Sequence, residues 1–281
     1  MTVPRRGGKL AFAVAKILDE AGVPCLIWGW LALALVASDQ GNREAAFVIN
    51  DHQIDEAKKA LSDAKFTQCT EPSCRELCED RGTKLSATCA KDNLHPVAEV
   101  HYHVEEQFSE YRILALYKKG AQLWWLPDLE LGSPAENDPY LTMSDSNRLP
   151  PHKELWNPEE DREECGHDNM PAFRGCSGPW TGQYAIKVLL PPAFLESIML
   201  LYCRDVGYPD GLPCLWDTML FFLMPYDEEL RYKIHPRFQA AWDSLQERGP
   251  PLQNIWVPMR ALRDSLSAAG ELRDMPSRKP A

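Results

Sequence analysis

The chain has 281 residues, 44% of them hydrophobic, which is enough to bury a large core in one domain or in one domain with an appendage. Its formal net charge is −11, and outside the termini no basic cluster is dense enough to bind a phosphate backbone, which argues against a nucleic-acid-binding protein. The apolar run at 26–37 is shorter than the roughly 20 residues that a membrane crossing needs, and no secretory signal is recognisable, so we expect a cytoplasmic protein without a membrane span.

The first part of the chain predicts helices alternating with strands. An amphipathic helix is expected over 2–22, followed by a central unit over 24–51. In this unit an apolar run reaches Gly29, an apolar helical segment and a polar turn follow, and a second apolar run ends the unit. The pattern predicts a strand, a tight turn, a helix and a second strand, with a ligand site at the strand ends.

A further helix and a third strand are expected after this unit. Apolar residues at helical spacing predict a helix over 51–64, capped by Asn50 or Asp51. The stretch 67–95 is polar and irregular, which predicts a surface excursion. Alternating β-branched and aromatic residues then predict a strand over 97–104 in the same sheet.

The chain is expected to fall into three regions. These are a core of strands and helices over 1–126, a Pro-rich insertion or lid over 127–182, and a strand with a helical part over 183–275 packed on the core. In the last region a strand is expected over 184–190. Helices are expected from Pro191 onward, over 215–224, over 227–248 with a break at Pro236, and over 258–269.

Nine cysteines, several of them inside apolar runs, are typical of reduced thiols in a cytosolic protein. Four of them, Cys69, Cys74, Cys78 and Cys89, lie near one another in the sequence and are candidates for a zinc site. Their spacing lacks the paired C-x2-C of most small zinc modules. The alternative, free thiols in an irregular segment, is therefore the favoured interpretation.

The order of elements from Pro24 to Val104, with Trp28-Gly29 after the first strand, resembles the minimal core of the nucleotidyltransferase superfamily. The chain also resembles uncharacterised fungal proteins along 27–29, 47–49 and 188–195. The resemblance implies an α+β fold, namely a nucleotidyltransferase-like mixed sheet with flanking helices, followed here by a helical C-terminal half.

The same resemblance locates candidate metal ligands. In that family the second strand carries two acids two positions apart and a later strand supplies a third, which together bridge divalent ions. Here Glu44 falls at the first acid position, Ala46 at the second and Glu99 near the third. A methyl group cannot hold a metal, so the set is incomplete. No metal or other cofactor is expected unless the chain is an active, Mg²⁺-dependent nucleotidyltransferase.

Three polar residues alternate along the predicted third strand. Glu99, His101 and His103 would point to one face of the sheet, about 6.6 to 7 Å apart. Because histidine titrates near neutral pH and a carboxylate can orient it, the pattern predicts an acid–base cluster, and a metal cluster is also compatible with it. The alternative is a solvated face, with the even-numbered residues of the strand buried.

Aromatic residues near the predicted strand ends are candidates for a substrate pocket, with the alternative that they belong to the core. Lys187, in the middle of a predicted strand, is expected to point into the same site or to lie on an exposed strand face. The candidate pocket residues are Trp28, Trp30, Tyr102, Trp180, Tyr184 and Lys187.

These features predict a repurposed nucleotidyltransferase-like protein that acts on a small, largely apolar organic molecule by proton transfer. It would be an isomerase, lyase or cyclase of secondary metabolism, with His101 or His103 as acid or base and Glu99 as the orienting group. One alternative is a catalytically inactive relative that binds a ligand or a protein, and another is a Mg²⁺-dependent nucleotidyltransferase. The expected partner is a small-molecule substrate, and the sequence leaves the oligomeric state open.

Overall fold

The computed structural model describes residues 8–37, 44–71, 74, 96, 98–108, 111–151, 178–206, 212–226, 230, 233–246 and 256–274. The chain divides into two compact units. The first comprises Met1–Thr70, Ala98–Lys118 and Asp128–Leu190 and contains the β-sheet. The second comprises the rest of the chain, and its described elements are helices.

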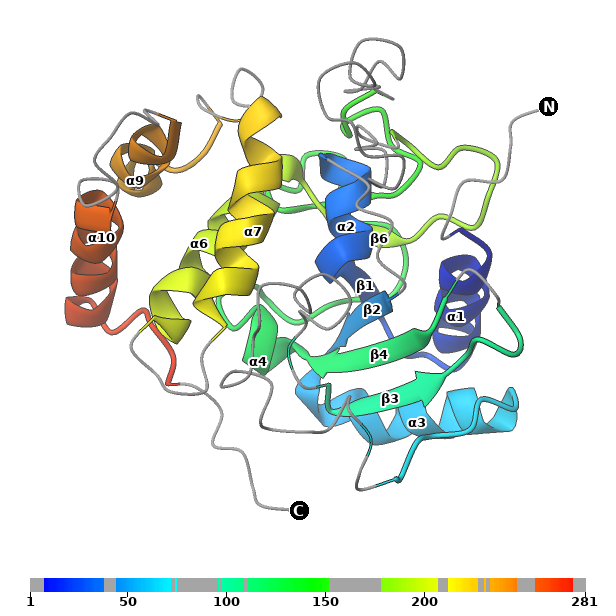
Figure 1. The fold of residues 1–281 in the computed structure, drawn as a ribbon. Coiled ribbons are helices and arrows are strands. Elements are labelled where there is room, and N and C mark those ends of the chain that lie inside the picture. Colours follow the sequence, from blue (N-terminus) through cyan, green and yellow to red (C-terminus); the bar gives the residue numbers. More distant parts are fainter. Residues whose placement is uncertain are drawn as a thin grey trace, which may run out of the picture. The chain divides into compact units, whose positions relative to one another are not determined.

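Six strands form one mixed sheet in the first unit, in the order β3-β4-β2-β1-β6-β5. Figure 1 labels all of them except β5. Their bounds are β1 Cys25–Trp28, β2 Glu44–Ile49, β3 Val100–His103, β4 Ile113–Lys118, β5 Leu141–Met143 and β6 Lys187–Leu189. β1 is antiparallel to β2 and parallel to β6, β4 is parallel to β2, and the edge strands β3 and β5 are antiparallel to their neighbours. The predicted mixed sheet with flanking helices is confirmed.

Three helices belong to the same unit: α1 (Gly8–Glu20), α2 (Gly29–Val36) and α3 (Ile54–Asp63). Every residue of α2 is buried, as its continuous apolar sequence predicts. Gly29 has a φ of +63°, a conformation that residues with a Cβ atom rarely adopt, and it joins β1 directly to α2. The predicted order of strand, tight turn, helix and strand is confirmed.

The predicted capping role of Asn50 is wrong. A short 3-10 helix, η1 (Asp51–Gln53), precedes α3, and Asn50 makes no side-chain capping hydrogen bond to it. The Asn50 amide instead donates to the carbonyl of Leu129 and accepts from the Leu129 N–H, both over 2.9 Å. These bonds hold the start of the Pro-rich region beside the end of β2.

Two strand boundaries and one strand differ from expectation. β3 begins at Val100, so Glu99 lies just outside it, and the strand expected over 184–190 is confined to β6. Within 127–182, residues 127–151 and 178–182 are described and contain no helix, as the prolines predict. They also contain β5, which was not predicted. Asp138 makes the turn before β5 by accepting hydrogen bonds from the next backbone N–H groups.

The second unit contains helices of the expected kind. They are α4 (Lys119–Gln122), α6 (Pro191–Asp205), α7 (Pro213–Leu223), η3 (Met224–Tyr226), α9 (Pro236–Gln246) and α10 (Trp256–Ala268). Asp205 joins two of them, because its buried carboxylate accepts a 2.6 Å hydrogen bond from the Trp216 indole and one of 2.6 Å from Arg204. Among the described residues, no helix has both the length and the apolar character that a membrane crossing needs.

Candidate functional site

Strand β3 directs its side chains alternately to two faces of the sheet. Tyr102 points to the face covered by α3, where it lines a pocket. His101 and His103 point to the other face, and their rings lie 5.3 Å apart at 84°. The prediction that the two histidines share a face is confirmed, and the same alternation separates them from the pocket that Tyr102 lines.

A cysteine lies beside the two histidines. The ligand atoms of Cys69, His101 and His103, all in the first unit, lie within 4.8 Å of one another. Cys69 is held there by backbone pairing, because its N–H donates to the carbonyl of His101 over 3.0 Å and the preceding Gln68 forms an antiparallel bridge with β3. Of the other cysteines considered as zinc ligands from the sequence, Cys74 belongs to the second unit, and Cys78 and Cys89 lie outside the described residues.

The three residues of this Cys/His cluster differ in exposure. His101 is 1% exposed, whereas the side chain of His103 is 40% exposed. Among the described residues Cys69 forms no disulfide, and it is half-buried. The His103 Nδ1 atom lies 3.9 Å from a carboxylate oxygen of Glu105. At this position the carboxylate can orient the imidazole ring of His103.

The predicted orienting acid, Glu99, interacts with a different residue. Its carboxylate forms a 2.7 Å ion pair with Lys118, and both side chains are 37% exposed. The structure therefore places Glu99 in a surface ion pair at the end of β3.

The metal candidates Glu44 and Glu99 are not brought together. Glu44 pairs with Ile113 of β4. The Glu99 N–H donates to the carbonyl of Leu116, which lies three positions further along β4. The two acids are therefore about 10 Å apart along the strand direction. The carboxylate of Glu44 is buried and accepts a 2.7 Å hydrogen bond from Tyr117. A paired metal site of the nucleotidyltransferase kind has no geometric support from these two residues.

The other predicted pocket residues are spread over the first unit. Trp28 and Trp30 are buried in β1 and α2. Trp180 packs edge-on against Phe12 with ring centroids 5.3 Å apart. The remaining two are Tyr184, whose hydroxyl donates to Asp19 over 2.7 Å, and Lys187, which is 5% exposed on β6. Of the six predicted pocket residues, Tyr102 alone lines the pocket under α3.

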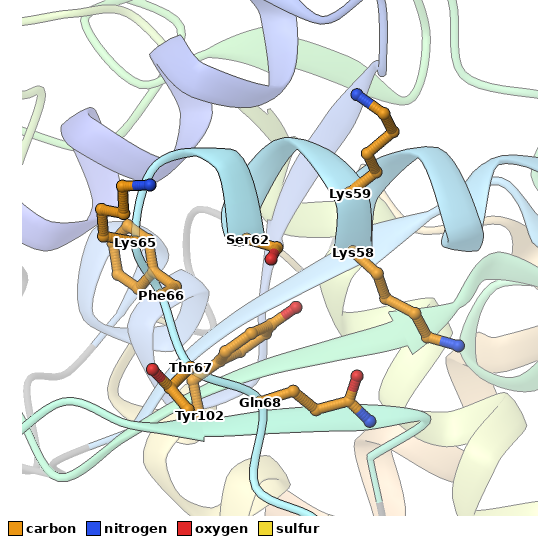
Figure 2. Close-up of a pocket in the computed structure, with 8 residues that line it drawn as sticks. All are labelled: Lys58, Lys59, Ser62, Lys65, Phe66, Thr67, Gln68 and Tyr102. Carbon is orange, nitrogen blue, oxygen red and sulfur yellow. The ribbon is translucent and has the colours of Figure 1, made fainter.

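That pocket has a volume of about 510 Å³ and lies between α3, the segment that follows it and β3 (Figure 2). Figure 2 shows the Tyr102 ring rising from β3 toward α3, with Lys58 and Lys65 on either side and Lys59 pointing away. The helix predicted over 51–64 gave no indication of this pocket, because no local pattern in the sequence shows that β3 lies beneath it. The pocket is lined by Lys58, Lys59, Ser62, Lys65, Phe66, Thr67, Gln68 and Tyr102.

The lysines of this α3–β3 pocket differ in their interactions. Lys58 forms a 3.1 Å ion pair with Asp55, and Lys59 forms one of 2.9 Å with Asp63. Lys65 makes no ion pair and no side-chain hydrogen bond within the described residues, and its φ of +71° is unusual for a residue with a side chain. It therefore supplies the positive charge in the pocket that is most available to a ligand.

Tyr102 contributes a buried polar group to the same pocket. Its side chain is 1% exposed, and among the described residues its hydroxyl has no hydrogen-bond partner. Burial raises the pKa of this hydroxyl to about 12, so it remains a neutral hydrogen-bond donor at physiological pH. A buried hydroxyl without a partner costs free energy, which a ligand can recover by binding to it.

The structure therefore contains two candidate sites in the same region, one on each face of β3. The α3–β3 pocket offers positive charge and hydrogen-bond donors, and the Cys/His cluster offers metal ligands. Comparison with family models, with curated proteins and with solved structures finds no match for this chain. Function is thus inferred from the geometry of these two sites.

Proposed function

We propose that this protein binds a small organic molecule that carries a negatively charged group, such as a phosphate or a carboxylate, in the α3–β3 pocket. The observation that carries the proposal is the buried Tyr102 hydroxyl, which lacks a partner among the described residues, beside the lysine-lined rim. A carboxylate or phosphate oxygen accepts hydrogen bonds both from a tyrosine hydroxyl and from a lysine ammonium group.

The charge of the pocket supports an anionic ligand. The chain as a whole has a formal net charge of −11, so its average potential repels anions. Three lysines nevertheless line this one pocket. Two of them are paired with acids of α3, which leaves Lys65 as the principal attracting charge.

The remaining lining supports an organic molecule larger than a free ion. Phe66 is 8% exposed and meets Tyr102 edge-on, with ring centroids 6.2 Å apart, so the pocket has an aromatic wall. Ser62, Thr67 and Gln68 add hydroxyl and amide groups. This mostly polar lining favours a charged, partly aromatic ligand over the largely apolar one expected from the sequence.

The pocket supports binding better than acid–base catalysis. His101 and His103 point to the opposite face of β3, and Glu99 is paired with Lys118. None of the described residues that line the pocket is a histidine. We therefore favour the ligand-binding alternative for a nucleotidyltransferase-like scaffold over the proton-transfer enzyme.

Thermal unfolding tests the proposal with adenosine monophosphate and inorganic phosphate as anionic probes and adenosine as a neutral one. A ligand at ten times its Kd stabilises the native state by about 1.4 kcal/mol, which raises Tm by a few degrees. We expect the anionic probes to raise Tm at millimolar concentration and adenosine to leave it unchanged.

Two variants locate the effect. Lys65→Ala and Tyr102→Phe should each reduce the shift caused by the anionic probes. Lys16→Ala is the matched control, because it removes an exposed lysine of α1 that lies 3.8 Å from Glu20. The proposal fails if neither anion raises Tm, or if both pocket variants respond as the wild type does.

A further inference from the structure

We propose that Cys69, His101 and His103 together bind one zinc ion and leave its fourth coordination position to an exchangeable ligand. Their ligand atoms lie within 4.8 Å of one another, and all three residues belong to the first unit. Three protein ligands and an open position are typical of zinc sites that hold water or a small ligand. The proposal is independent of the one for the α3–β3 pocket, because the histidines point to the other face of β3.

Strand pairing brings the three ligands to one face of the sheet. His101 and His103 are two positions apart on β3, so their side chains point the same way. Gln68 and Tyr102 form an antiparallel bridge. The next residue along, Cys69, therefore lies opposite His101, and its N–H donates to the His101 carbonyl over 3.0 Å. The backbone of the first unit thus positions all three ligands before metal arrives.

The distances are close to those of a bound site. Zn–S bonds of about 2.3 Å and Zn–N bonds of about 2.0–2.1 Å place the ligand atoms of a tetrahedral site roughly 3.3–3.6 Å apart. The ligand atoms of the cluster lie within 4.8 Å of one another. His103 is 40% exposed and Cys69 is half-buried, so their side chains have room for the small rotations that close the difference.

The ligand chemistry selects the class of metal. Thiolates and imidazoles prefer zinc and other borderline or soft transition metals, whereas Mg²⁺ and Ca²⁺ prefer oxygen ligands. Because zinc is usually four-coordinate, one thiolate and two imidazoles leave one position to be filled. The exposure of His103 gives solvent access to the cluster, so we expect water at this position and expect a small anion to replace it.

The surroundings of His103 fit a metal ligand as well. Its Nδ1 atom lies 3.9 Å from the Glu105 carboxylate, which leaves Nε2 for the metal. A carboxylate at the second ring nitrogen is the usual outer partner of a zinc-bound histidine, and it fixes the orientation of the ring. Glu105 is therefore assigned as a positioning residue for His103.

Zinc would also fasten the segment that forms one wall of the α3–β3 pocket. Phe66, Thr67 and Gln68 line the pocket and lead directly to Cys69. When zinc joins Cys69 to the histidines of β3, this segment becomes fixed to the strand. Cys69 binds as a thiolate, so zinc uptake by the thiol form releases its proton to solvent.

Metal content tests the proposal directly. The chain purified after expression with added zinc should contain about one zinc per chain by mass spectrometry of the metal. Cys69→Ser and His103→Ala should lose most of it. Cys214→Ser and His52→Ala are matched controls that change an exposed cysteine and an exposed histidine elsewhere, and they should retain the wild-type content.

A triple variant tests whether the first unit alone supplies the protein ligands. Cys74, Cys78 and Cys89 all belong to the second unit, and replacing the three by serine together should leave the zinc content unchanged. In the wild type loaded with Co²⁺ in place of zinc, azide should shift the visible absorption by taking the fourth position. A triple variant without zinc, or a cobalt spectrum that excess azide leaves unchanged, would contradict the three-ligand site.

The role of Glu105 is tested through affinity. Glu105→Gln should weaken zinc binding roughly tenfold or more, measured by competition with a chromophoric chelator. The Tm of the metal-free variant should equal that of metal-free wild type, which separates positioning of His103 from a general loss of stability. Glu106→Gln, at the exposed neighbouring acid, is the matched control and should bind zinc as the wild type does. Equal affinity of wild type and Glu105→Gln would remove the positioning role.

A measurement on the wild type covers variants that fail to fold. Protein stripped with a chelator is treated with an alkylating reagent, with and without zinc, and the modified cysteines are mapped by mass spectrometry. Zinc should slow alkylation of Cys69 but not of Cys74 or Cys214. The proposal is overturned by a wild type without stoichiometric zinc and without protection of Cys69. It is equally overturned by a zinc content that stays the same in Cys69→Ser and His103→Ala.

Discussion

The hydroxyl of Tyr117 donates a 2.7 Å hydrogen bond to the buried carboxylate of Glu44, across the parallel pair β4 and β2. Glu44, which the family resemblance gave as a metal ligand, therefore accepts a hydrogen bond in the core of the sheet. Ala46, at the second acid position, lies 3.6 Å from the position that a Cβ atom on Gly29 would occupy. The residues at this end of the sheet stabilise packing between strands.

Tyr117→Phe should lower the free energy of unfolding by about 1–3 kcal/mol. The variant removes one donor from a buried carboxylate, and hydrogen bonds to charged groups are the stronger kind. Urea unfolding followed by circular dichroism measures the loss. Tyr140→Phe, at a tyrosine that is 39% exposed, is the control and should change stability by less than about 0.5 kcal/mol. Equal effects of the two substitutions would contradict the assigned role of Tyr117.

Removal of zinc should destabilise the wild-type protein. A metal that binds only the native state adds about 2.7 kcal/mol when its free concentration is a hundred times Kd. A chelator should therefore lower Tm, and added zinc should restore it. In Cys69→Ser the chelator should have little effect, because a ligand of the Cys/His cluster is absent. An equal response in wild type and variant would indicate that zinc stabilises the protein elsewhere.

Asn50→Ala should be among the most destabilising single substitutions in the first unit. It removes the two 2.9 Å bonds that the Asn50 amide makes with the backbone of Leu129, and both groups are then left buried without these partners. The expected loss is about 2–3 kcal/mol, measured by urea unfolding. Asn50→Asp keeps the acceptor and loses the donor, so it should fall between wild type and Asn50→Ala. A loss in Asn50→Ala below about 0.5 kcal/mol would show that Leu129 is held by other contacts.

Stability should fall at alkaline pH partly through Tyr102. Burial raises the pKa of its hydroxyl to about 12 in the native state, whereas an unfolded chain loses this proton near its ordinary pKa of about 10. Between these values the native state binds more protons, so this contribution to stability is complete below about pH 10 and is lost as pH rises toward about 12.

The contribution of Tyr102 is isolated by measuring the free energy of unfolding of wild type and of Tyr102→Phe from neutral pH to about pH 12. The other titrating groups contribute equally to both proteins, so the difference between the two curves reports Tyr102. Wild type should lose stability relative to the variant above about pH 10, and parallel curves would contradict the expectation. At neutral pH the variant should be as stable as wild type or more so, because it removes a buried hydroxyl without a described partner.

Local patterns were sufficient to predict much of the fold. The unit from β1 to β2 followed from apolar runs, the polar turn and Gly29, and the shared face of His101 and His103 followed from the two-residue period of a strand. These features depend on neighbours in the sequence. The helical elements after Pro191 were predictable for the same reason.

The sites depend on contacts between distant segments, which local patterns do not contain. The cysteines and the histidines were each recognised as possible metal ligands, but as separate groups. Pairing of Gln68 with Tyr102 is what places Cys69 beside His101. The signal that was available is compositional, because a cysteine and a His-x-His together supply residue types that bind transition metals. The lysines of the α3–β3 pocket gave no comparable signal, since exposed lysines are usual on a helix.

The position of β1 in the sheet has a consequence for synthesis on the ribosome. Leu26 pairs with Lys187, so the β6 side of β1 lacks its partner until roughly 160 more residues have been made. At about 5–20 residues per second this takes on the order of ten to thirty seconds. During that interval a hydrophobic strand edge is open to other nascent chains, and an expression host rich in chaperones should give the higher yield of folded protein.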